Sequence, residues 1–375
     1  MEGLGPWISW QPKVKLGATS YSNAEKDKDS LHHSSHKAQK IFRMKLNDIL
    51  KERIVILDGA MGTMIQKHNL QEEDYRGERF KDFHTSLKGN NDLLVLTQPH
   101  IIKDIHREYL AAGADLIETN TFNANIISMI DYDMVDLVDE LNYEAVRLAK
   151  EACEEYSTPD KPRFVVGSLG PTNKTASISP QVNDPSYRDV DFDTLANVYF
   201  LQAKTMLEAG VDALLVETIF DTLNAKAAFY GIQDAIEKTG INVPLMASGT
   251  ITDKSGRTLS GQTTEAFLIS LEHLDLVSVG LNCALGATDL IPYLEVLAEK
   301  APFYVSAYPN AGLPNAFGGY DETPEMMRDF IKPFLDKKLV NILGGCCGTT
   351  PEHIKLMADL AKEYEPRKIN EQCQA

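Results

Sequence analysis

Short apolar runs alternate with longer amphipathic stretches along most of this chain. This alternation is typical of a parallel α/β architecture, in which each strand is followed by a helix. The apolar runs predict eight strands, at 54–57, 115–118, 164–168, 213–217, 244–248, 276–280, 303–307 and 341–344. Eight strands with intervening helices favour a closed (β/α)8 barrel, the TIM barrel, over an open sheet.

The predicted helices begin and end at residues that suit those positions. Pro99, Pro324 and Pro351 each fall in a predicted first turn, where a helix needs no hydrogen bond from the proline nitrogen. A helix–strand unit also recurs, because the segment 209–218 resembles the segment 112–119 with two residues inserted. The recurrence supports the barrel.

Polar, acidic, glycine and thiol residues follow every predicted strand. In a closed barrel the carboxyl ends of all strands lie on one face, and this is where enzymes of the fold keep their active sites. Cys283 follows the sixth predicted strand, and the adjacent pair Cys346 and Cys347 follows the eighth. We therefore expect the three cysteines to meet on one rim of the barrel.

These three cysteines predict a zinc site. Adjacent cysteines rarely bridge to each other, but both can face one cation where flanking glycines let the backbone bend. Cys346, Cys347 and Cys283 together provide three soft ligands with room for a fourth, which is the pattern of a catalytic zinc site. A substrate thiol bound at the fourth position loses its proton. The predicted chemistry is transfer of an alkyl group to that thiolate.

Two acidic residues after predicted strands are candidates for substrate binding. Asp58 and Glu217 stand where the ammonium group of an amino acid could be held. The backbone N–H groups of the turn 59–63, which begins at Gly59, could bind a carboxylate at a helix start. An acid in such a position is as often a helix cap, so the residues alone leave both readings open. The glycine spacing in this turn does not match a dinucleotide-binding fingerprint.

Composition limits the partners of the chain. A net charge of −17 over 375 residues argues against nucleic acid and anionic membranes as partners. No apolar run is long enough to span a bilayer. Five cysteines without a cleavable signal pattern predict a reducing compartment, the cytoplasm. Cys153 and Cys373 are expected to be thiols outside the metal site.

The chain divides into three predicted parts. Residues 1–44 are polar, include a histidine cluster and show no sustained period, so we expect a disordered N-terminal extension. Residues 45–364 carry the strand–helix alternation and form the expected barrel. Residues 365–375 are again polar and predict a loose C-terminal tail.

Several motifs taken together resemble the homocysteine S-methyltransferase family. They are DGAMGT at 58–63, GNND at 89–92, ETNTF at 118–122, GPT at 170–172, GLNC at 280–283 and GGCCG at 344–348. The stretches 248–263 and 308–324 further resemble the N-terminal homocysteine-binding module of cobalamin-dependent methionine synthases. The likeness extends from about residue 46 to about residue 362 and covers nearly all of the predicted barrel.

The resemblance implies a zinc-dependent methyltransferase that binds homocysteine and forms methionine. The three cysteines of the rim would be the zinc ligands. Asn310 would supply a labile fourth ligand that the homocysteine sulfur displaces. Asp58 and Glu217 would hold the substrate ammonium, and the turn at Gly59 would hold its carboxylate.

The resemblance leaves the methyl donor open. Cobalamin-dependent methionine synthases continue into folate and cobalamin domains, so we expect a methylcobalamin-type donor that a partner or missing domains would supply. One alternative is a standalone methyltransferase that uses S-methylmethionine or S-adenosylmethionine. Another is a non-catalytic module that binds zinc and homocysteine. A betaine donor is disfavoured because the barrel contains no tryptophan for an aromatic cage. A Schiff-base lyase is disfavoured because no lysine stands at a predicted strand end.

Overall fold

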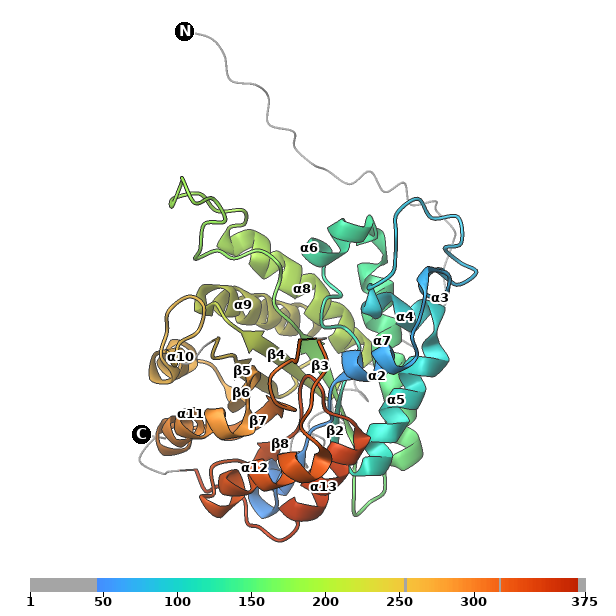
Figure 1. Cartoon of the computed structure of the whole chain (residues 1–375). Helices are drawn as coiled ribbons and strands as arrows, with labels where there is room; N and C mark the ends of the chain where they lie inside the picture. The colour runs from blue at the N-terminus through green and yellow to red at the C-terminus, as the bar shows by residue number, and fades with distance from the viewer. Residues whose placement is uncertain (1–45, 253–254, 317, 370–375) are drawn as a thin grey trace.

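Eight parallel strands form one sheet at the centre of the protein (Figure 1). The computed structural model describes residues 46–252, 255–316 and 318–369. The strand order is β1-β8-β7-β6-β5-β4-β3-β2. The strands are β1 (Val55–Ile56), β2 (Leu116–Glu118), β3 (Phe164–Leu169), β4 (Ala213–Ile219), β5 (Leu245–Gly249), β6 (Leu276–Gly286), β7 (Tyr304–Asn310) and β8 (Ile342–Leu343).

The first and last strands of this order meet and close the sheet into a barrel. Leu57 pairs with Leu116 in a parallel bridge. The N–H of Asp115 donates to the carbonyl of Ile56 at 2.7 Å, and the N–H of Asp58 donates to the carbonyl of Leu116 at 3.0 Å. The predicted (β/α)8 barrel is therefore confirmed.

Helices follow the strands and surround the barrel (Figure 1). The longer ones are α5 (Pro99–Ala112), α7 (Val138–Tyr156), α8 (Phe192–Ala209), α9 (Thr222–Thr239), α10 (Thr264–Leu271), α11 (Ala287–Lys300), α12 (Pro324–Asp336) and α13 (Pro351–Ala361). Shorter helices lie in the loops after β1 and β2, namely α2 (Met61–Lys67), α3 (Glu72–Arg76), α4 (Leu94–Thr97) and α6 (Ile126–Met129), with 3-10 turns at Asn91–Leu93, Ile130–Tyr132 and Val135–Leu137.

The proline-based helix starts are confirmed. α5, α12 and α13 each have proline in the first turn. The Thr323 side chain caps α12 by accepting the N–H of Met326 at 3.3 Å. At its other end, α5 stops at Gly113, whose φ of 117° places it in the left-handed region that favours glycine.

Two buried clusters lie on the two sides of the barrel wall. Side chains such as Val55, Leu116 and Phe164 fill the inside, and Leu46 and Leu50 from the helical segment 46–52 join them. The larger cluster lies between the strands and the surrounding helices. Because the strands are buried on both faces, they read in the sequence as continuous apolar runs.

Gly231 lets α8 and α9 pack with their backbones in direct contact. A Cβ atom at this position would lie 2.1 Å from the Ala196 carbonyl oxygen and 2.8 Å from the Phe200 nitrogen. Because neither backbone atom can move without shifting a helix, we expect Gly231→Ala to lower the free energy of unfolding by about 3 kcal/mol. Urea unfolding measures this change. Lys226→Ala, on the exposed side of α9, is the control and should leave the midpoint unchanged.

His106 on α5 is fully buried, and neither ring nitrogen has a hydrogen-bond partner. Burial lowers the pKa of His106 from 6.5 to about 4. Between pH 7 and pH 5 this histidine therefore becomes protonated in the unfolded chain but stays neutral in the folded chain. The free energy of unfolding falls by about 2 kcal/mol over this range. We expect His106→Leu to lose this part of the pH dependence in urea unfolding. An unchanged slope against pH in the variant would contradict the assignment.

The predicted tails are described only in part. The N-terminal extension 1–44 and residues 370–375 lie outside the described residues. In the described part of the C-terminal tail, the Arg367 guanidinium is buried and donates to the carbonyls of Ala298, Ala301 and Phe303. The three-part division itself stays a prediction. Among the described helices, none combines the length and apolar character that a membrane span requires.

Candidate active site

Three cysteines come together at the carboxyl ends of β6 and β8. The Sγ atoms of Cys283 and Cys347 are 3.7 Å apart, and those of Cys346 and Cys347 are 4.0 Å apart. All three sulfur atoms lie within 4.8 Å of one another. A tetrahedral zinc ion with Zn–S bonds of about 2.3 Å separates its sulfur ligands by about 3.8 Å. The spacing therefore fits a zinc ion held by three thiolates.

The backbone at Cys283 is bent where β6 leaves regular pairing with β7. Cys283 has a φ of 59° and Ala284 a φ of 54°, values that are uncommon for residues other than glycine. The register between the two strands shifts between Asn282 and Gly286. A bulge of this kind changes the direction of a side chain, and here it accompanies the approach of Cys283 to the other cysteines.

The pair Cys346 and Cys347 is fixed by backbone hydrogen bonds to Pro309 at the end of β7 and to Ala311, which follows this strand. The N–H of Cys346 donates to the Pro309 carbonyl, and the N–H of Ala311 donates to the Cys347 carbonyl, both at 2.9 Å. Gly348 then turns the chain with a φ of 84°. β6 and β7 are longer than the predicted strands because their pairing continues beyond the barrel wall to Gly286 and Asn310. We call the hydrogen bonds to Pro309 and Ala311 the cysteine clamp.

Asn282 joins the cysteines to the neighbouring strands. Its buried Oδ1 accepts the Ser248 hydroxyl at 2.7 Å and the Thr218 N–H at 3.1 Å. Its Nδ2 donates to Thr218 Oγ1 at 2.9 Å and lies 4.0 Å from Cys346 Sγ. Sequence reasoning missed this role, although the position of Asn282 next to Cys283 was a signal.

A pocket of about 380 Å³ opens beside the cysteines. Its lining includes Gly59, Thr63, Glu118, Ser168, Glu217, Tyr320 and the three cysteines. Among the described residues that line it, none is a lysine, arginine or histidine. The pocket therefore offers thiols, acids and amides, with no basic side chain to balance the acids.

Three acids, Asp58, Glu118 and Glu217, stand near the carboxyl ends of β1, β2 and β4. Asp58 Oδ2 accepts the backbone N–H of Glu118 at 3.0 Å, and Glu217 accepts the Ser168 hydroxyl. Asp58 Oδ1 and Glu118 Oε1 are buried without a hydrogen-bond partner. Such unpartnered oxygens are costly to bury unless a ligand satisfies them.

Burial raises the pKa of each of these carboxyl groups. For Asp58 and Glu118 the charge of Glu217 adds to the effect, and their pKa values lie well above the usual range. The pKa of Glu217 rises to about 7, chiefly through burial. Like charges in one low-dielectric site resist simultaneous ionisation. A cation in the pocket would therefore favour the ionised form of all three.

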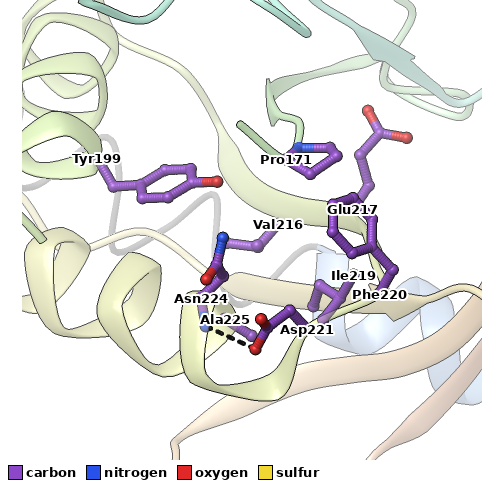
Figure 2. A pocket seen from close by; sticks show the side chains of 9 residues that line it. All are labelled: Pro171, Tyr199, Val216, Glu217, Ile219, Phe220, Asp221, Asn224 and Ala225. Carbon is purple, nitrogen blue, oxygen red and sulfur yellow. Dashed lines mark hydrogen bonds between the residues drawn. The ribbon is translucent and has the colours of Figure 1, made fainter. Parts of the chain in front are cut away.

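Figure 2 shows Glu217 beside a second, small cavity, which Pro171, Tyr199 and Asn224 help to line. The cavity measures about 10 Å³ and holds at most one water molecule. The Glu217 carboxylate points away from Asp221 and Asn224 (Figure 2). The hydrogen bond from the Ser168 hydroxyl holds the Glu217 carboxylate on the side of the main pocket, which both residues line.

Hydrogen bonds among the thiols shift their pKa values in opposite directions. Hydrogen bonds from Cys283 and Cys346 lower the pKa of Cys347 to about 3, and the Tyr320 hydroxyl adds to this effect. Hydrogen bonds with the neighbouring thiols, and after them burial, raise the pKa of Cys346 well above its usual range. In a group of closely spaced thiols, the first thiolate to form is stabilised by hydrogen bonds from the remaining thiols. Its negative charge then makes the next proton harder to remove.

The predicted site residues do not all reach the pocket. Gly59, Glu217 and the three cysteines line it, whereas Asp58, the residue before Gly59, is buried and does not line it. Asn310, the last residue of β7, is buried and does not appear in the lining. Its Oδ1 has no hydrogen-bond partner. Asn310 is next in sequence to Ala311, whose N–H donates to the Cys347 carbonyl in the cysteine clamp.

Comparison with known proteins defines the class of enzyme. Residues 55–361 match the family model described as homocysteine S-methyltransferase. The fold and the match define a barrel methyltransferase. The chain belongs to the homocysteine S-methyltransferase family, as its motifs predicted.

Solved structures with the same fold include the homocysteine methyltransferase MmuM from Escherichia coli. Its oxidized form matches with a TM-score of 0.64 at 20% identity, over 82% of this chain and 96% of that chain. Its metallated form matches with a TM-score of 0.61 at 20% identity, over the same shares of the two chains. At this level of identity the likeness supports the fold.

Proposed function

We propose that the protein forms methionine by transferring a methyl group to homocysteine at a zinc site. The observation that carries this proposal is the spacing of the Cys283, Cys346 and Cys347 sulfurs, which fits three corners of a zinc tetrahedron. All three residues line the pocket, so the fourth corner is accessible to a substrate. When bound there, zinc supplies a thiolate at neutral pH, where a free thiol with a pKa of about 8.5 is mostly protonated.

The remaining groups of homocysteine find complementary partners in the pocket and among the buried residues next to it in the chain. Asp58 and Glu217 would hold its ammonium group, since both are acids at strand ends and no basic side chain lines the described pocket. The backbone of the turn 59–63 would receive its carboxylate. Asn310 would supply a labile fourth ligand, and its unpartnered Oδ1 supports that role.

In the reaction, the homocysteine sulfur attacks the methyl carbon of a donor. A sulfur–carbon bond forms while the bond from that carbon to the donor's leaving atom breaks, and the donor departs with the bonding electron pair. The residues of this chain contribute by orienting the substrate, because binding it at both ends aligns its sulfur with the pocket. Methylcobalamin from a partner or from further domains, as in methionine synthases, is the proposed donor. Cobalamin- and folate-binding modules are the corresponding partners.

A second donor class also has a structural argument in its favour. Phe122 and Tyr320 line the pocket, and aromatic faces attract cations such as the sulfonium groups of S-methylmethionine and S-adenosylmethionine. The pocket, at about 380 Å³, is also within the range that holds drug-sized ligands. A standalone methyltransferase with a sulfonium donor is therefore the alternative proposal.

The test is methionine formation by the zinc-loaded protein with homocysteine and one donor at a time. The donors are methylcobalamin, S-methylmethionine, S-adenosylmethionine and betaine. Turnover with methylcobalamin alone supports the methionine-synthase reading, and turnover with a sulfonium donor supports the alternative. Binding of zinc and homocysteine without turnover by any donor would reduce the protein to a binding module and contradict the catalytic proposal.

A further inference from the structure

Glu118 is an acid of the pocket for which the proposed function has no task. It is the last residue of β2, between Asp58 after β1 and Ser168 on β3. Glu118 lines the pocket, and its backbone N–H is the group that Asp58 Oδ2 accepts at 3.0 Å. It therefore lies beside one proposed ammonium ligand.

The side chain of Glu118 has the features of an incomplete binding site. Its Oε1 is buried without a hydrogen-bond partner, as is Oδ1 of Asp58, which is 3% exposed. Three other buried acids, Asp92, Asp115 and Asp221, have structural partners, and Asp92 accepts the N–H of Asn123 at 3.0 Å. Asp115 pairs with Arg53 at 2.7 Å, and Asp221 accepts the N–H of Leu223 at the start of α9 at 2.9 Å.

The balance of charge points to a cationic ligand. Asp58, Glu118 and Glu217 can carry three negative charges, and the described lining contains no lysine, arginine or histidine. Burial raises the pKa of Glu118, and the charges of Glu217 and Asp58 add to this effect. A primary ammonium group has three N–H donors and one positive charge, and so provides one donor for each acid.

We propose that Glu118 completes a three-carboxyl receptor for the substrate ammonium and thereby selects α-amino thiols over thiols without an amino group. This inference rests on the proposed function, because it assigns a specificity residue to the same pocket. When a thiol without the ammonium group binds, the negative charges of the three acids have no cation to compensate them. Binding energy at this end of the substrate then decides which thiols reach the cysteines.

The test compares two thiols on the zinc-loaded full chain by isothermal titration calorimetry. L-Homocysteine carries the ammonium group, and 4-mercaptobutyrate is the same molecule without it. We expect Glu118→Gln to weaken homocysteine binding by about tenfold to a hundredfold, as loss of a charged hydrogen bond does. Binding of 4-mercaptobutyrate should stay the same or become tighter, because one unbalanced acid has been removed.

The matched control is Glu322→Gln. Glu322 is also an acid with a buried unpartnered oxygen, but it does not line the pocket, so both affinities should stay at the wild-type values. Thermal melting checks that each variant is folded. Equal weakening of both thiols by Glu118→Gln, or no weakening of either, would overturn the inference and leave the proposed function standing. A wild-type protein that takes up zinc but binds neither thiol would overturn both.

Discussion

Cys346→Ala should lose zinc binding and methyltransferase activity while keeping a folded barrel. Structural zinc sites bind with about 10–16 kcal/mol shared among four ligands, so one thiolate contributes about 3 kcal/mol, more than a hundredfold in affinity. The barrel should survive, because its core lies inside and around the strands and does not depend on this side chain. Zinc content after dialysis, activity and a circular dichroism melt measure the three outcomes.

The control for this variant is Cys153→Ala. Cys153 is a buried free thiol on α7, and no metal-ligating cluster among the described residues includes it. Its truncation should lower stability modestly through the cavity it creates and leave zinc content at the wild-type level. Global unfolding of Cys346→Ala would show that the cysteine holds the fold together, and retained zinc would show that it is not a ligand.

Glu217→Ala should weaken homocysteine binding far more than zinc binding. The change removes a buried carboxylate that accepts the Ser168 hydroxyl and lines the pocket. Losing a charged hydrogen bond to the substrate ammonium costs about 2 kcal/mol, which is roughly thirtyfold in affinity. Calorimetric titrations with zinc and then with homocysteine separate the two effects.

Asp212→Ala is the matched control for Glu217→Ala. Asp212 precedes β4 at its amino end and accepts the Val165 N–H at 2.8 Å, on the opposite side of the barrel from the pocket. Its loss should reduce stability without changing homocysteine affinity. Equal loss of zinc and homocysteine in Glu217→Ala would show that this residue is structural.

The eight strands could be predicted from the sequence because barrel strands buried on both faces give uninterrupted apolar runs. The extension of β6 and β7 could not, because their added residues include Asn282, Cys283 and Asn310, which carry no apolar signal. That extension is held by pairing between distant segments, and local patterns do not report such pairing.

The candidate site shows the same division. Strand order alone predicted that Cys283 would meet Cys346 and Cys347, since strand ends of a barrel share one face. Glu118 also stood at a strand end, but nothing local distinguishes an acid that lines a pocket from one that caps a helix. The surroundings of Glu118 depend on its buried neighbours Asp58 and Glu217, which come from other strands and are distant in the sequence.

The cysteine clamp has a thermodynamic consequence. Because two main-chain hydrogen bonds and the end of β7 already hold Cys346 and Cys347, metal uptake has little backbone entropy to lose. Zinc fingers differ, since their metal-binding energy is also their folding energy. Calorimetry of zinc uptake by this barrel should therefore give a heat-capacity change near zero, the signature of an ion that enters a framework already assembled.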